Sequence, residues 1–424
     1  MNKFLERWMP IWLLMVVCFG AQPWMTVHVF PPVIVYLISF IVLFVYAAVF
    51  IKDWRRSPMV LRLFLGWVLI NALRGLLYAE GYYDFKFLVE NLTVYLIPLC
   101  VVYFSRPENV QKSIRLPVMA SMFMLVFFYP ISFPEASMRL LFLLPLLVPF
   151  VFRVNLRQAG FVILMLIAFA WTGSLESRAA ITRMAVSLFF AVVFLLPPWF
   201  TGKRFLGIVS SVFFTAPIVL LVAAGFYDFN IFVDTFNNLG GKYIIKTTEG
   251  SQTDQEDLAG DTRTFIYEET LVSATLQDYW LMGHTLSRGY TSPTFRDTDP
   301  ISFNRGERPN SEVGILNIFT HMGLIGVVLY TIVFLMAAYR ALTRARSPEM
   351  RVMGALVAFR WFLSWTEEFT IFDINQNIIW LMVAMCLSTE FLEMDGPTFR
   401  KFLSGCFYKV TVGAEATHRT IGER

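Results

Sequence analysis

Residues 227–312 read YDFNIFVDTFNNLGGKYIIKTTEGSQTDQEDLAGDTRTFIYEETLVSATLQDYWLMGHTLSRGYTSPTFRDTDPISFNRGERPNSE. Apolar runs of membrane-spanning length fill most of the chain before this polar segment, and another run, 313–339, follows it directly. Loops longer than about 15 residues are uncommon in compact proteins unless they are functional or disordered. We therefore expect this segment to carry part of a functional site at a membrane surface.

The composition is typical of a protein that lies in a membrane. Of the 424 residues, 57% are hydrophobic and 16% are charged, whereas soluble domains carry about 25% charged residues. Mean hydropathy is +0.59 and the net charge is +4. The four cysteines all lie in or beside apolar runs and show no Cys-x-x-Cys spacing, so neither a disulfide framework nor a structural zinc site is predicted.

About twelve apolar runs approach the roughly 20 residues that a helix needs to cross a bilayer. They are 8–22, 33–51, 59–73, 87–104, 116–133, 139–152, 159–173, 179–200, 205–226, 313–339, 352–366 and 374–392. We predict an all-α fold, a polytopic transmembrane helix bundle with one large, partly helical periplasmic loop. A bundle of about nine spans would occupy 1–226, and the loop would occupy 227–312. The remaining spans would occupy 313–392, and a cytoplasmic tail would follow at 393–424.

Basic residues in short connections mark the cytoplasmic side of a membrane protein. If the N-terminus is cytoplasmic, the inner connections hold most of them: Lys52, Arg55, Arg56, Arg106, Lys112, Arg115, Arg153, Arg157, Lys203, Arg204, Arg340, Arg344, Arg346 and Arg351. The short outer connections hold only Arg74, Lys86, Arg139, Arg178 and Arg183. We expect both termini in the cytoplasm of a bacterial cell, with the protein in its inner membrane and the polar loop in the periplasm.

Within the loop, the apolar stripe of 261–277 predicts a helix that Asp261 or Thr262 could cap. Residues 250–260 are expected to be flexible. Residues 283–308, rich in Gly, Pro, Ser, Thr and Asp, are expected to form turns.

Arg178 and Arg263 are the first candidates for chemistry. Arg178 lies where the seventh predicted span meets the eighth, on the side poor in basic residues, and a guanidinium fork there suits a pyrophosphate group. It could instead reach up to lipid phosphates. Arg263 lies at the start of the loop helix, where free N–H groups could help it bind a second phosphate oxygen. Its alternative role is a surface ion pair with Glu268 or Asp261.

Glu312 is the candidate general base. If Asn310 or Ser311 caps the next span, Glu312 lies in the first turn of that helix at the outer surface and faces a sugar hydroxyl. Acidic residues also favour helix starts for dipole reasons alone, which is the structural alternative.

Other titratable residues complete the candidate set. Arg360 lies inside a predicted span, where it needs a carboxylate or phosphate partner, and a structural ion pair with Glu367 or Glu368 is the simpler explanation. Arg308 and His284 are expected to bind substrate, and His284 is also a second candidate base. No GxSxG, P-loop, HExxH or paired-aspartate motif lies in the loop, so hydrolase, nucleotide-hydrolysing and metal-dependent functions are not favoured.

Three stretches resemble the superfamily of bacterial O-antigen polymerases and O-antigen ligases, inner-membrane glycosyltransferases. The stretches are 177–179 with its Ser-Arg pair, Arg263 followed by 280–283, and the helix that runs from 316 to Gly326. The superfamily usually has a histidine at the start of that helix, and Glu312 stands at the matching position here. The resemblance therefore carries the role of base to Glu312.

The resemblance implies inverting glycosyl transfer that needs no metal or other cofactor. The donor would be a polyprenyl-pyrophosphate-linked oligosaccharide, its pyrophosphate held by arginines, and the acceptor a sugar hydroxyl. We expect a polymerase of O-antigen, capsule or exopolysaccharide repeat units, with a chain-length regulator as a possible partner and no nucleic acid.

Other functions stay open. The same chemistry would serve a ligase that transfers glycan to lipid A core or protein. A lipid-linked sugar flippase or transporter belongs to a different class, which often shows internal repeats that are not visible here. A receptor that uses the loop as a binding module is a further alternative.

Overall fold

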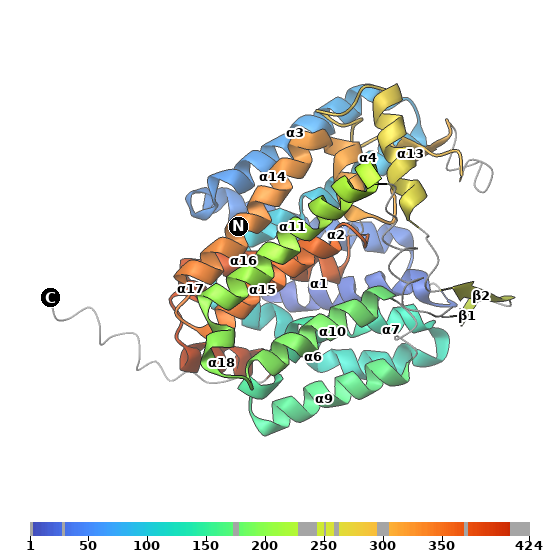
Figure 1. The fold of residues 1–424 in the computed structure, drawn as a ribbon. Coiled ribbons are helices and arrows are strands. Elements are labelled where there is room, and N and C mark those ends of the chain that lie inside the picture. The colour runs from blue at the N-terminus through green and yellow to red at the C-terminus, as the bar shows by residue number, and fades with distance from the viewer. Residues whose placement is uncertain are drawn as a thin grey trace.

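A computed structural model describes residues 3–27, 30–172, 178–227, 244–249, 252–257, 263–294, 305–368 and 372–407. Within these ranges the chain is mostly helical, as Figure 1 shows. The strands there form two short antiparallel ribbons. The prediction of an essentially all-α fold is confirmed at this level.

The first half of the chain forms helices in close succession. They are α1 (Lys3–Ala21), α2 (Pro32–Lys52), α3 (Met59–Tyr78), α4 (Tyr82–Tyr95), α5 (Cys100–Phe104), α6 (Pro107–Phe128), α7 (Pro134–Leu140), α8 (Leu144–Leu147), α9 (Leu156–Trp171), α10 (Arg178–Val193) and α11 (Lys203–Tyr227). Short 3-10 helices connect or extend them: η1 (Gln22–Trp24), η2 (Trp54–Arg56), η3 (Ile97–Leu99), η4 (Tyr129–Ile131), η5 (Val148–Arg153) and η7 (Pro198–Thr201).

The second half contains the strands and the remaining helices. They are β1 (Ile244–Glu249), β2 (Gln252–Asp257), α13 (Thr264–Leu276), β3 (Tyr290–Thr291), β4 (Glu307–Arg308), α14 (Gly314–Arg344), α15 (Pro348–Leu363), α16 (Ile374–Leu387), α17 (Thr389–Leu392) and α18 (Gly396–Phe407).

Six helical stretches among the described residues are long and apolar enough to cross a membrane. They are Val33–Lys52, Met59–Tyr78, Tyr82–Phe104, Pro107–Ile131, Lys203–Ala223 and Gly314–Arg344. Several of them also keep large apolar side chains exposed, such as Leu77 and Phe123, as a helix facing lipid does. The chain is therefore a membrane protein.

The predicted span 139–152 is not one continuous helix. The region is divided into α7, α8 and η5, with Pro145 inside α8 and Pro149 inside η5. A proline ring lacks the N–H that the helical ladder needs and clashes with the preceding turn. Apolar composition alone identifies this stretch as a candidate span but does not reveal that the prolines divide it.

Strands replace two segments expected to be flexible or turns. Residues 252–257, inside the supposedly flexible 250–260, form β2, which pairs antiparallel with β1. The β-branched Ile244, Ile245, Thr247 and Thr248 of β1 favour that conformation. In the region 283–308, β3 pairs with β4 and joins Tyr290 to Arg308.

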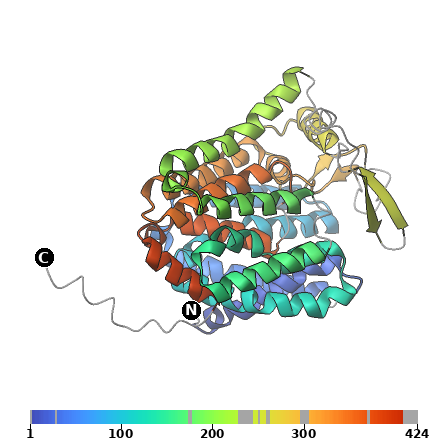
Figure 2. The same ribbon diagram turned by 60° about the horizontal axis from the view of Figure 1, so that its bottom comes forward.

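The helices have two distinct ends in Figures 1 and 2. At the loop end lie α13 and the β1–β2 ribbon, and at the opposite end lies α18. Polar contacts join the connections at the opposite end, where Arg106 Nη2 lies 2.6 Å from Asp53 Oδ2 and Lys203 Nζ donates to Thr343 O at 2.7 Å. The amphipathic α18 packs there with Phe399 and Phe402 buried.

Helix α14 breaks at Gly323, which positions the loop. Gly323 has φ 65° and ψ −169°, and Gly283 of the loop has φ 76°. The two backbones meet: a Cβ built on Gly283 would lie 2.5 Å from Gly323 N, and one on Gly323 would lie 2.2 Å from Leu281 O. Only residues without side chains fit this contact. We call it the glycine contact.

Backbone groups freed by the break find partners across the glycine contact. Leu324 N donates to Trp280 O at 2.8 Å, and Ile325 N donates to Leu281 O at 3.3 Å. On the other side of the break, Thr320 O accepts from the backbone N–H of His284 at 2.6 Å.

Helix α3 supports the same contact from the side. Trp67 Nε1 donates to Met322 O at 2.9 Å, and Arg74 Nη1 donates to Met282 O at 2.9 Å. The segment 280–284 is therefore fixed to both α14 and α3.

Replacement of Gly323 by alanine should destabilise the protein strongly. The backbone conformation alone costs a residue other than glycine about 1–3 kcal/mol, and the new Cβ would also collide with Leu281 O. Thermal unfolding of the purified protein in detergent measures the effect. Gly207→Ala in α11, where an added Cβ meets nothing within 4 Å, is the matched control and should keep or raise the unfolding midpoint. Equal midpoints for the two variants would contradict the role of the glycine contact.

Candidate functional site

The structure places Glu312 just before α14, so the prediction that it lies in the first helical turn is wrong. Val313 is the N-cap residue, and no side chain caps the helix there. Ser311 instead exchanges hydrogen bonds with Asn317: Ser311 N donates to Asn317 Oδ1 at 2.6 Å, and Asn317 Nδ2 donates to Ser311 O at 2.8 Å. These bonds fix the chain on one side of Glu312, whose side chain is 49% exposed.

Arg308 is the basic partner of Glu312. Arg308 Nη2 lies 3.3 Å from Glu312 Oε1, and Arg308 Nη1 lies 3.3 Å from the Tyr290 hydroxyl oxygen. Because Arg308 belongs to β4 and Tyr290 to β3, the small ribbon holds the guanidinium in place. Two residues of the predicted site are thus in contact.

The first N–H groups of α14 bind a turn that follows α15, residues 364–367. Gly314 N donates to Glu367 O at 2.8 Å, and Ile315 N donates to Ser364 O at 2.8 Å. The N-terminal N–H groups of a helix need such partners when they are buried. This 364–367 turn therefore fixes where α14 begins, two residues after Glu312.

The same turn contacts the elements that carry Arg263 and Arg178. Arg263 is the N-cap residue of α13, and one turn later Tyr267 Oη donates to Trp365 O at 2.5 Å. Arg178 begins α10, and its side chain lies outside the described part of the structure. Arg183, further along α10, lies with its Nε 3.5 Å from Glu367 Oε1.

Charged side chains are clustered behind the 364–367 turn. Arg360, only 9% exposed, interacts electrostatically with Glu367, Arg183 and Asp373. Asp373 is in turn paired with Arg139 and also accepts from Gln376 N at the start of α16. Glu367, one of the two partners expected for Arg360, thus belongs to the same charged cluster.

Arg139, Arg183 and Asp373 were not among the predicted site residues. Each is a charged residue near the end of an apolar run, and that signal was available in the sequence. Their convergence depends on which helices are neighbours, and the sequence does not supply that.

His284 lies directly after the glycine contact. Its ring stacks on Tyr279 with centroids 5.0 Å apart, and its Nδ1 is 2.7 Å from Gly289 O. A carbonyl oxygen only accepts, so Nδ1 carries the proton and the neutral ring keeps an unprotonated Nε2. Burial is the main cause that lowers the pKa of His284 below its ordinary value, which favours this neutral form.

His321 is a core residue. It is fully buried, and its ring nitrogens lie near Tyr95 Oη at 2.9 Å and Pro309 O at 3.1 Å. The bond to Pro309 O fixes the loop just ahead of Glu312 against the second turn of α14.

A cavity of about 360 Å³ opens at the loop end. It lies between the α3–α4 turn with the start of α4 and a second wall made by Ser287, Gly289, Arg305, Glu307 and Pro309. Its wall includes Tyr82, Tyr83 and Phe87. Arg305 crosses it to reach Glu80 and Asp84. Sequence reasoning missed this cavity because the two walls are more than two hundred positions apart.

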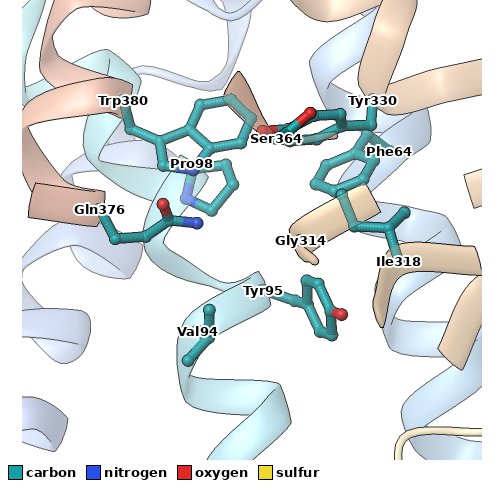
Figure 3. A pocket seen from close by; sticks show the side chains of 10 residues that line it. All are labelled: Phe64, Val94, Tyr95, Pro98, Gly314, Ile318, Tyr330, Ser364, Gln376 and Trp380. Carbon is teal, nitrogen blue, oxygen red and sulfur yellow. The ribbon is translucent and has the colours of Figure 1, made fainter. Parts of the chain in front are cut away.

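A second, smaller cavity lies in the bundle beneath the start of α14 (Figure 3). At about 10 Å³ it has room for about one water molecule. Gln376 points its amide into it beside Trp380 (Figure 3), and the Oε1 atom has no hydrogen-bond partner among the described residues. The cavity is too small for a sugar.

Comparison with known proteins finds no family model that matches the chain, no similar curated protein and no similar solved structure. The resemblance to O-antigen polymerases and ligases therefore remains a prediction from the sequence. Two of its stretches, 280–283 and the one ending at Gly326, meet at the glycine contact.

The buried neutral form of His284 should make stability depend on pH. Because its pKa is lower in the folded chain, the unfolded chain binds a proton first as the pH falls below about 6.5, and the stability that His284 contributes is lost there. His284→Asn keeps an amide that can donate to Gly289 O but does not titrate. Unfolding midpoints between about pH 8 and pH 5 should therefore fall less steeply for this variant. Parallel curves for the two proteins would show that His284 does not contribute.

Proposed function

We propose that the protein is a metal-independent inverting glycosyltransferase that polymerises lipid-linked repeat units. The observation that carries the proposal is the convergence on the 364–367 turn. The helix begun by Arg178, the helix begun after Arg263 and the helix begun after Glu312 each make a contact to this turn. Arginines and a carboxylate distant in sequence are thereby held on neighbouring elements at one end of a membrane bundle.

Arginines suit the leaving group of this reaction. A glycosyl pyrophosphate carries several negative charges, and planar guanidinium groups bind phosphate oxygens through paired hydrogen bonds. Arg178, Arg263 and Arg360 are proposed to hold the pyrophosphate. Fixed positive charge would stabilise the negative charge that develops as the bond from the anomeric carbon to the phosphate oxygen breaks.

Glu312 is proposed to accept the proton of the acceptor hydroxyl. The acceptor oxygen then forms its bond to the anomeric carbon, and the lipid pyrophosphate leaves from the opposite face with the bonding electrons. Attack from the opposite face inverts the anomeric configuration. The half-exposed carboxylate beside Arg308 supports this role, because it is both accessible and positioned. His284, neutral and with Nε2 unprotonated, is the second candidate for the base.

The 360 Å³ cavity is the proposed binding site for the acceptor sugar. Its wall includes Pro309, three residues before Glu312. Aromatic rings such as Tyr82 and Phe87 suit the apolar faces of sugars, and the carboxylates of Glu80 and Asp84 suit their hydroxyl groups.

The proposed topology has about twelve crossings, with cytoplasmic termini and a periplasmic loop in a bacterial inner membrane. The gathering of basic connections at the opposite end, including Arg56, Arg106, Lys203 and Arg351, supports that orientation.

The test uses purified full-length protein in vesicles with lipid-linked repeat units, which are extracted from cells that lack the gene. Loss of a general base typically costs about 10²–10⁴-fold in rate, so Glu312→Gln should slow chain extension by that order. Arg263→Ala and Arg360→Gln should also slow it. Arg400→Ala, exposed on α18 at the opposite end, is the control and should retain activity. Product length is followed by gel electrophoresis and mass spectrometry.

The outcomes separate the functions. Full extension by all three site variants would remove this mechanism. Repeat units that cross the vesicle membrane without being extended would favour a flippase. Transfer only to added lipid A core, without extension, would favour a ligase.

A further inference from the structure

A cavity at the opposite end of the bundle has more basic than acidic side chains among the described residues that line it. Its volume is about 240 Å³, and it lies between the starts of α3 and α17 and the ends of α5, α14 and α16. Its charged lining residues are Arg56, Arg340 and Glu390. Two cations therefore face one anion in this space.

Arg340 is the unusual member of this cavity. Its Nε is buried, and within the described residues the guanidinium has neither a hydrogen-bond partner nor an ion pair. Arg344, one turn further along α14, adds to the positive potential. The residue as a whole is only partly buried. A cation that is partly removed from water and has no counter-ion is still costly, so such a group is expected to have an anionic partner.

Arg56 does not relieve this imbalance. Its Nη1 lies 3.6 Å from Glu390 Oε1, and the two side chains are 52% and 50% exposed. Glu390 is thus engaged at the solvent edge by Arg56, which leaves the charge of Arg340 uncompensated.

The rest of the lining is partly apolar and partly hydroxyl-bearing. Val101, Val102 and Leu387 line the cavity together with Pro58 and Ala384, and Ser105, Ser388 and Thr389 add side-chain hydroxyl groups. Leading up to Arg340, α14 exposes Val328, Ile332, Leu335 and Tyr339, as a surface that faces acyl chains does. The cavity thus combines a partly buried guanidinium with a wall of apolar and hydroxyl-bearing side chains at the end of a membrane helix.

We propose that this cavity binds the phosphate group of an anionic phospholipid. Arg340 donates to the phosphate oxygens, Arg56 closes the solvent edge, and the apolar wall contacts the glycerol backbone. A guanidinium fork matches phosphate geometry. The further basic residues nearby, including Lys52, Arg55 and Arg62, favour a headgroup with net negative charge over a zwitterionic one. This site is independent of the proposed glycosyl transfer.

The test measures lipid binding to the purified full chain in detergent by native mass spectrometry. The probes are phosphatidylglycerol and phosphatidylcholine of the same acyl composition. The unmodified protein should retain phosphatidylglycerol in preference. Arg340→Gln should weaken that binding at least about tenfold, because hydrogen bonds between charged groups are the strong ones. Arg344→Gln removes the same charge from an exposed position outside the cavity and should change binding by less than about twofold.

Further variants and a competition experiment separate a specific lipid site from general surface attraction. Arg340→Lys keeps the charge but loses the fork and should bind with intermediate affinity, and Arg56→Gln serves if the Arg340 variants do not fold. Inorganic phosphate at millimolar concentration should not displace the lipid. Equal losses for Arg340→Gln and Arg344→Gln would show mere surface attraction and overturn the proposal. Displacement by inorganic phosphate, or no preference for the anionic lipid, would overturn the lipid assignment.

Discussion

A helix that breaks inside a membrane protein frees backbone N–H and C=O groups that the bilayer core cannot satisfy. In α14 the break at Gly323 is satisfied by protein alone, through the carbonyls of Trp280 and Leu281 and the N–H of His284. This requirement determines the path of the loop. The chain must come close enough to bond on both sides of the break, and only glycine at 283 and 323 lets the two backbones approach that far. The ribbon that holds Arg308 and the position of Glu312 follow from that path.

Charged side chains inside the bundle need partners just as the freed backbone groups do. At the loop end, the buried Arg360 lies among Glu367 and Asp373, which are also paired with Arg183 and Arg139. A carboxylate bound by two cations has less negative charge left for each, so such a cluster can accept a further anion at modest cost. At the opposite end, Arg340 forms no ion pair within the part of the chain that the structure describes. The two ends therefore offer different environments to phosphate-bearing molecules.

The sequence predicted the helices well where the apolar runs were long, since about 20 such residues are helical in a membrane. Boundaries failed where tertiary contacts decided them. The helix after Glu312 seemed to need a side-chain cap, but its first N–H groups bind carbonyls of the 364–367 turn, which local sequence cannot reveal. Likewise α6 begins at Pro107, well before its apolar run, because Gln111 and Arg115 bind carbonyls of α18. Arg308 was predicted as a site residue, but its contact with Glu312 depends on the β3–β4 pairing.

The glycine contact also limits how a substrate can arrive. The segment is bonded on both sides of a broken helix and is tied to α3 through Arg74, so it cannot move away from the bundle without losing all of these bonds together. Residues 280–284 thus form a fixed crossing over the break in α14. A molecule anchored in the bilayer by an isoprenoid chain would therefore meet a fixed backbone at residues 280–284, and any opening for it would have to come from other elements.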